Sequence, residues 1–160
     1  MKNEAEFNTI VTHSLTFGHK IGDQGSTITG FHGKNPFDGF GIASTDLGNF
    51  PVYFESKYLK EPAAFNWNRL EDHQMENLLL CKTLLPECLA LFLVCVDFGR
   101  ANKKVFVFRD MDYISERKIS KKSITKKEFI ARQNFILVKK NKIDFNEIVK
   151  MPLDLEYYEI

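Results

Sequence analysis

Nine consecutive apolar residues at positions 88–96 constrain the fold more than any other feature of the sequence. A membrane-spanning helix needs about 20 such residues, and this run ends at Asp97, so it predicts a buried strand of a globular protein. A turn sequence at 99–102 separates it from a second apolar run at 105–108. The two runs therefore predict two strands joined by a tight turn.

The first third of the chain shows both helical and strand patterns. Apolar residues that recur at helical spacing predict an amphipathic helix over residues 3–17, which Gly18 would end. Strand-like runs at 40–44 and 52–58 flank a turn signal at 46–49. They predict a β-hairpin.

Capping pairs mark the helices of the remaining chain. Asn68 and Glu71 resemble a capping box that starts a helix running to about residue 85. Thr125 with Glu128, and a similar pair at 144 and 147, predict two short helices on either side of a strand at 135–139. We therefore expect one α/β domain over residues 1–160, with a mixed sheet flanked by helices.

Composition excludes several classes of protein. The 160 residues are 44% apolar and 27% charged, which is typical of a globular domain and excludes a wholly disordered or collagen-like chain. The N-terminus lacks the apolar core of a signal peptide, so we expect a cytoplasmic protein that does not contact membranes. Three cysteines spaced seven residues apart fit neither a metal site nor a disulfide framework, and we expect them to be buried apolar residues.

The net charge of +1 conceals a strong asymmetry. Residues 100–142 carry fourteen Lys and Arg against four acidic residues, whereas residues 1–99 carry seven basic and twelve acidic residues. A basic segment beside an acidic one is typical of a polyanion-binding face next to a carboxylate site. A lysine-rich surface that contacts only solvent is equally compatible with the charges.

A carboxylate and an amine share one face of the strand at 52–58. Side chains alternate along a strand, so Glu55 and Lys57 point the same way, while Ser56 points to the other face. Burying such a pair is costly, and apolar residues would often serve stability as well, so the pair indicates a function. A solvated pair on an edge strand is the alternative, and the Glu-x-Lys pattern taken alone favours it, because so short a pattern often occurs by chance.

One residue upstream of this pair, Asp38, and one downstream, Gln74, are candidates to lie beside it in the fold. Asp38 begins the partner strand of the predicted hairpin, which would bring it close to Glu55. Two neighbouring carboxylates repel unless a cation joins them, and hard oxygen ligands favour Mg²⁺, with Mn²⁺ as a substitute. Gln74 shares a helical face with Leu78, Cys81 and Leu85, which is expected to pack on the sheet. Its side chain is expected either to reach this region or to bond a backbone group.

Three segments in order resemble the RecU family of Holliday-junction resolvases, within the PD-(D/E)xK nuclease superfamily. They are Asp-Gly-Phe-Gly at 38–41, Tyr-Phe-Glu-Ser-Lys at 53–57, and the stretch at 65–76 that carries His73 and Gln74. The similarity continues more loosely to about residue 150. It implies a restriction-endonuclease-like fold, that is, an α/β fold with a mixed β-sheet flanked by helices.

The resemblance also implies an activity, a Mg²⁺-dependent DNA endonuclease that acts as a homodimer on four-way junctions. Asp38, Glu55 and the Ser56 carbonyl would hold the metal, Lys57 would orient or activate water and stabilise charge at phosphorus, and Gln74 would support the site. The expected DNA contacts are basic residues and one histidine on several segments: Lys20, Lys34, His73, Arg117, Lys118, Lys121 and Lys122.

The sequence departs from the family in two places. Family members usually carry an acidic residue in the first helix, but here Phe7 is followed by Asn8, and Glu4 and Glu6 lie at other helical angles. This favours one metal, or a weaker second one. The segment at 22–35 is shorter than the family's stalk, and it is either a reduced stalk or a loop.

Three alternative functions follow from the same residues. The first is a restriction-like or phage-type nuclease that cuts duplex DNA. The second is a catalytically weakened DNA-binding protein of the same fold. The third is an interaction domain in which Glu55 and Lys57 form a solvated ion pair.

Overall fold

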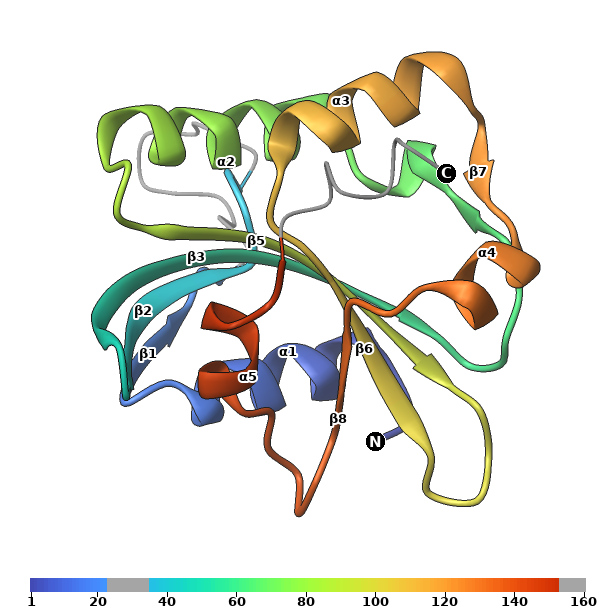
Figure 1. Ribbon diagram of the computed structural model, residues 1–160, viewed down its shortest axis with the longest axis horizontal. Coiled ribbons are helices and arrows are strands. Elements are labelled where there is room, and N and C mark those ends of the chain that lie inside the picture. The colour runs from blue at the N-terminus through green and yellow to red at the C-terminus, as the bar shows by residue number, and fades with distance from the viewer. Residues whose placement is uncertain (23–34, 153–160) are drawn as a thin grey trace, which may run out of the picture.

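The computed structural model describes residues 1–22 and 35–152 (Figure 1). It has a six-stranded mixed sheet with the strand order β1-β2-β3-β5-β6-β8, and helices cover both faces. The strands of this sheet are β1 (Phe17–Lys20), β2 (Gly39–Thr45), β3 (Gly48–Leu59), β5 (Leu89–Asp97), β6 (Lys103–Phe108) and β8 (Phe135–Leu137). The predicted α/β fold with a mixed sheet flanked by helices is confirmed.

Five helices and a small second sheet complete the described chain. The helices are α1 (Glu4–Ser14), α2 (Asp72–Leu84), α3 (Met111–Ser120), α4 (Lys126–Ala131) and α5 (Phe145–Val149), with a 3-10 turn at Trp67–Arg69. The second sheet pairs β4 (Phe65–Asn66) with β7 (Ser123–Ile124). Figure 1 shows α1 and α5 below the main sheet and α2 and α3 above it.

The apolar run at 88–96 supplies the centre of both core layers. All residues from Leu89 to Val96 are buried, and their side chains alternate between two hydrophobic clusters. Leu91 packs with Phe7 of α1 on one face, and Phe92 packs with Trp67 on the other. The prediction of a buried strand is therefore confirmed, because only a strand with both faces covered removes every one of these side chains from water.

The β2–β3 hairpin matches the prediction, and two glycines determine how closely β2 passes its neighbours. Gly39 pairs with Phe54, and a Cβ on Gly39 would lie 2.6 Å from the Phe54 ring. A Cβ on Gly41 would lie 2.1 Å from the Phe17 carbonyl oxygen of β1. Only glycine permits this close approach of the Phe54 ring and of the β1 backbone to β2.

The helix predicted over 3–17 ends early, at Ser14. Thr16 donates its backbone N–H to the Ile42 carbonyl at 3.0 Å, so the chain leaves the helix to join the sheet. Gly18 consequently lies in β1 and does not end the helix. Pairing with β2 supplies hydrogen bonds that a longer helix would have made internally.

The start of α2 was predicted too early. Asn68 lies in the 3-10 turn, and the helix begins at Asp72 with Glu71 as its N-cap. The capping box is formed by Glu71 and Gln74 instead, since Gln74 Oε1 accepts the Glu71 backbone N–H at 2.9 Å. The face predicted from Gln74 through Leu78 is buried at Leu78, but Leu85, at the far end, is 45% exposed.

Sequence patterns missed α3 and partly described the C-terminal elements. Asp110 caps α3 by accepting from the Asp112 and Tyr113 amides, but few residues of this helix are apolar. The capping box of Thr125 and Glu128 at α4 is confirmed. β8 ends at Leu137, two residues before the predicted end.

The expectation that the cysteines are buried holds for two of the three. All three cysteines are free, with Cys88 and Cys95 buried and Cys81 partly exposed. Within residues 1–22 and 35–152, no helix has the length and apolarity needed to cross a membrane.

Candidate active site

Asp38 lies where the β2–β3 ladder ends. Its backbone N–H donates to the Phe54 carbonyl at 3.0 Å, and its carbonyl accepts from Ile21 at 2.8 Å. Its side chain reaches past the end of β2: Oδ2 accepts from both the backbone N–H and the hydroxyl of Ser56, each at 2.8 Å. Asp38 thus replaces the strand partner that Ser56 would otherwise lack on this side of β3.

Glu55 is fully buried, and its two carboxylate oxygens have different surroundings. Oε1 accepts from Lys57 Nζ at 2.8 Å and from Gln74 Nε2 at 2.8 Å. Oε2 is buried and has no hydrogen-bond partner among the described residues. A buried carboxylate oxygen without a donor is rare in native proteins because its desolvation is not compensated.

The first turn of α2 holds Gln74 in one orientation. The capping bond from the Glu71 amide fixes Oε1, so the amide nitrogen of the same side chain points to Glu55. Gln74 thus does both of the things that the sequence left open, since it accepts a backbone N–H and donates to the Glu55 carboxylate. The helix end therefore has a second role, which is to position a donor for Glu55.

Glu4 and Arg69 join this centre, and sequence reasoning missed both. Glu4, in the first turn of α1, contacts Lys57 Nζ at 3.3 Å through Oε1 and Arg69 Nη2 at 3.1 Å through Oε2. Arg69 Nη2 also donates to the Tyr58 carbonyl at 3.4 Å. The available signal was an acidic residue in the first helix, but its contact with β3 depends on how that helix docks on the sheet.

Burial and like charge raise the pKa of both central carboxyl groups. Burial and the neighbouring Asp38 raise the pKa of Glu55 to about 7, although Lys57 opposes the shift. Burial also raises the pKa of Asp38, with the Ser56 hydrogen bonds opposing it. Burial lowers the pKa of Lys57, but Glu55, Glu4 and Asp38 outweigh it, so the net shift is upward and Lys57 is an ammonium group.

The oxygen ligands fit a hard divalent cation. Glu55 Oε2 has no hydrogen-bond partner among the described residues, and the Asp38 carboxylate lies close enough to raise the pKa of Glu55. The Ser56 N–H donates to Asp38, and because the N–H and C=O of one residue point to the same side of an antiparallel strand, the Ser56 carbonyl faces that side too. Carboxylate and carbonyl oxygens are ligands that hard divalent cations prefer. No group of three or more His, Cys, Asp or Glu side chains in the described residues is placed to hold a metal ion. A metal here would therefore complete its coordination with backbone oxygen, water or phosphate.

His73 lies beside the segment that leads to Asp38. Its Nε2 contacts the Asn35 carbonyl at 3.0 Å, and its Nδ1 lies 3.3 Å from a Glu71 carboxylate oxygen. The imidazole is about three-quarters buried. These contacts fix the chain just before Asp38, which is a positioning role that the sequence did not suggest.

The side chains predicted to contact DNA differ in how many hydrogen bonds and ion pairs they make to other groups of the protein. Arg117 pairs with Glu128 at 2.7 Å, and Lys118 pairs with Asp72 at 2.8 Å while donating to the Leu70 carbonyl at 2.6 Å. Lys121 and Lys122 are exposed.

The two remaining predicted contacts lie toward the N-terminus. Lys20 is exposed in β1, and its ammonium group bonds the Thr9 hydroxyl. Lys34 lies outside the described residues.

Comparison with known proteins assigns no family to this chain. No protein-family model matches the sequence, and the search of curated proteins found no match.

Proposed function

We propose that this protein is a Mg²⁺-dependent DNA endonuclease that hydrolyses phosphodiesters in branched DNA, specifically at four-way junctions. One observation carries the proposal. The buried Glu55 carboxylate has one oxygen held by Lys57 and Gln74 and the other without a partner in the described chain, beside a partly buried second carboxylate at Asp38. This arrangement lowers the stability of the metal-free protein, and a cation bound between the two carboxylates would compensate their charge.

Asp38, Glu55 and the Ser56 carbonyl are the residues that would hold Mg²⁺, or Mn²⁺ in its place. When bound there, the metal would supply a Lewis acid for a phosphoryl oxygen and a water of lowered pKa. The chain supplies the orientation of its ligands. Ser56 holds Asp38 through two hydrogen bonds, and Gln74 holds Glu55 through one.

Lys57 and Gln74 have different roles: Lys57 stabilises charge on the substrate, and Gln74 positions Glu55. As an ammonium group, Lys57 is suited to stabilise the negative charge that builds on phosphorus oxygens, and not to remove a proton. Its contacts with Glu55 and Glu4 aim it before substrate arrives, which lowers the reorganisation needed in the reaction. Gln74 keeps the Glu55 carboxylate from turning.

The substrate class rests on charge and on the resemblance to junction resolvases. Exposed lysines between α3 and α4 would bind backbone phosphates, and two copies of the chain would make symmetric cuts in a four-way junction. A DNA substrate agrees with the cytoplasmic location expected from the sequence.

Cleavage of a labelled synthetic junction, compared with a linear duplex of the same sequence, tests the proposal. With Mg²⁺ or Mn²⁺ we expect wild-type protein to cut the junction, and Asp38→Asn and Glu55→Gln to lower the rate by about a hundredfold or more. The matched control is Glu87→Gln, an exposed carboxylate, which should leave the rate unchanged.

Each alternative function has its own outcome in this experiment. Equal cutting of duplex and junction would replace the junction assignment with a duplex nuclease. Retention of intact DNA with and without metal would indicate a binding protein. Cleavage that Asp38→Asn and Glu55→Gln leave unchanged would overturn the assigned site.

A further inference from the structure

Beside the acidic centre, the Glu4 carboxylate of α1 bridges two cations that belong to other elements. Its Oε1 lies 3.3 Å from Lys57 Nζ of β3, and its Oε2 lies 3.1 Å from Arg69 Nη2 of the 3-10 turn. The Glu4 and Arg69 side chains are 41% and 39% exposed, so the bridge lies at the surface. An anion in solution can therefore approach the two cations.

The Glu4 side chain is held by these two cations alone. Within the described chain its carboxylate makes no other hydrogen bond. The start of α1 does not depend on it, because Asn3 caps the helix by accepting the Glu6 amide. The ion pair with Arg69 is exposed on both sides, and such pairs add little to stability because water competes for both partners. Glu4 can therefore leave the two cations without disturbing the helix.

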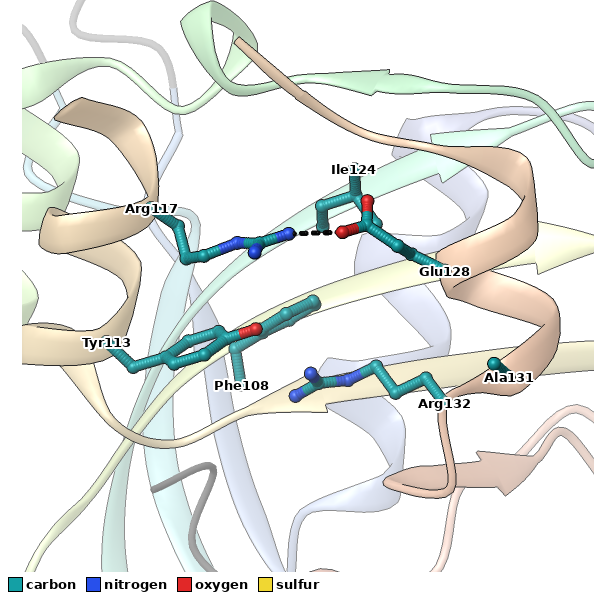
Figure 2. A pocket seen from close by; sticks show the side chains of 7 residues that line it. All are labelled: Phe108, Tyr113, Arg117, Ile124, Glu128, Ala131 and Arg132. Atoms are coloured by element: carbon teal, nitrogen blue, oxygen red, sulfur yellow. Dashed lines mark hydrogen bonds and ion pairs between the residues drawn. The ribbon is translucent and has the colours of Figure 1, made fainter. Parts of the chain in front are cut away.

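The ion pair between Arg117 and Glu128 is the opposite case. Figure 2 shows the two side chains meeting between α3 and α4, where Arg117 Nη2 lies 2.7 Å from Glu128 Oε1. Glu128 Oε2 also accepts the Thr125 backbone N–H at 2.7 Å, as part of the capping box of α4. An anion that displaced Glu128 would have to break this helix cap, whereas an anion that displaced Glu4 would not. Of the two arginines, Arg69 is therefore the one that can exchange its carboxylate.

Contacts other than Glu4 keep Arg69 in place. Its guanidinium carbon lies 5.3 Å from the Phe65 ring centroid, and its Nη2 also donates to the Tyr58 carbonyl at 3.4 Å. Trp67, which is 1% exposed, anchors the 3-10 turn that carries Arg69. Both hydrogen bonds of the guanidinium within the described chain use Nη2, which leaves Nη1 and Nε to donate to an oxygen ligand. The planar guanidinium matches the paired oxygens of a phosphate as well as those of a carboxylate.

We propose that Lys57 and Arg69 form a seat for one phosphate of the DNA backbone, and that Glu4 occupies this seat until the phosphate displaces it. The inference rests on the proposed function, because it takes DNA as the ligand of the acidic centre. A phosphodiester presents two oxygens and one negative charge, as the Glu4 carboxylate does. Lys57 also contacts Glu55 at 2.8 Å, so the seat places the phosphate beside the carboxylates assigned to the metal. Glu4 keeps both cations in position before DNA arrives, and its exchange for a phosphate leaves the local charge unchanged.

Binding of a labelled synthetic four-way junction to the full chain in EDTA tests the seat without cleavage. We expect Glu4→Gln to lower the dissociation constant about threefold, the factor that corresponds to losing one exposed ion pair, because a neutral amide competes poorly with phosphate for the two cations. We expect Arg69→Gln to raise the dissociation constant about tenfold or more, as for loss of one charge-assisted hydrogen bond. Arg69→Lys keeps the charge and should recover part of that loss.

Matched controls separate the seat from a general effect of net charge. Glu6→Gln removes the same charge from the same turn of α1, and Arg100→Gln removes a positive charge from an exposed turn. Both should leave the dissociation constant unchanged. In a double variant with Arg69→Gln, the gain from Glu4→Gln should shrink, because Glu4 then competes for one cation instead of two. Circular dichroism shows whether each variant is folded.

The sign of the Glu4→Gln effect distinguishes a displaceable carboxylate from a purely structural one. If Glu4 only oriented Lys57 and Arg69, Glu4→Gln would weaken binding, and that result would overturn the proposal. No junction binding by wild type, or a gain no larger than that of Glu6→Gln, would also overturn it. Cleavage by wild type in Mg²⁺ is measured separately. The expected affinity changes without cleavage would support the seat in a DNA-binding protein and reject the nuclease, whereas cleavage without those changes would reject the seat alone.

Discussion

Glu55 shows at the scale of one residue how stability and function oppose each other in this chain. Lys57 and Gln74 satisfy Oε1, but Oε2 is buried without a partner among the described residues, and Asp38 repels the ionised form. A side chain chosen for stability alone would not be a carboxylate here. The metal-free protein is therefore expected to be more stable when Glu55 is neutral.

Glu55→Gln should stabilise the metal-free protein above neutral pH. The pKa of Glu55 is about 7 in the folded chain against 4.5 when unperturbed, so between these values only the folded state keeps the proton. The free energy of unfolding then falls as the pH rises, by roughly 3 kcal/mol in total. Denaturant unfolding in EDTA at pH 5 and pH 8 measures this difference.

The control for this prediction is Glu87→Gln, whose carboxylate is exposed. It should leave the pH dependence of wild-type unfolding unchanged. Glu55→Gln should instead flatten that dependence and unfold at higher denaturant concentration at pH 8. A Glu55→Gln protein that loses stability at pH 8 would mean that the carboxylate is favourably solvated or paired in the metal-free state.

At the scale of elements, β2 sits so close to β1 that Gly41 has no room for a side chain. A Cβ would lie 2.1 Å from the Phe17 carbonyl oxygen, and a backbone atom cannot move aside as a flexible side chain can. Gly41→Ala should lower the free energy of unfolding by roughly 2 kcal/mol or more and loosen β1. Thermal unfolding and hydrogen exchange of the β1 amides measure both effects.

Gly22→Ala is the matched control, because a Cβ at that position meets no atom within 4 Å. Its free energy of unfolding should lie within about 0.5 kcal/mol of the wild-type value. If Gly41→Ala were as stable as Gly22→Ala, β2 would have to accommodate the methyl group by moving away from β1, and the stated strand contact would be wrong.

Local patterns predicted those elements and site residues whose positions depend on near neighbours in sequence. Strand alternation placed Glu55 and Lys57 on one face, and the hairpin brought Asp38 to the same point. Glu4 escaped prediction because its position depends on the docking of α1 against the sheet. Helix α3 was missed because it buries only Met111 and Ile114, while its other isoleucine, Ile119, is exposed, so its apolar residues do not form one continuous face.

At the scale of the whole molecule, the basic residues of the segment at 100–142 are divided between two sides of the sheet. Lys121 and Lys122 are exposed at the end of α3, above the sheet in Figure 1. The exposed lysines at 139 and 140 belong to the turn after β8, on the side of α1 and α5. Charge counted along the sequence therefore does not correspond to one binding surface.

This division makes the DNA-binding face testable with matched pairs of substitutions. The double variant Lys121→Gln with Lys122→Gln should weaken junction binding and reduce the slope of log affinity against log salt by up to about two, because each lysine that neutralises a phosphate releases about one counterion. Lys139→Gln with Lys140→Gln removes the same charge from the opposite side and should leave both quantities unchanged. Gel retardation in EDTA over a range of salt concentrations measures binding without cleavage. Equal losses from the two pairs would show that net charge, and not the α3 side of the sheet, governs binding.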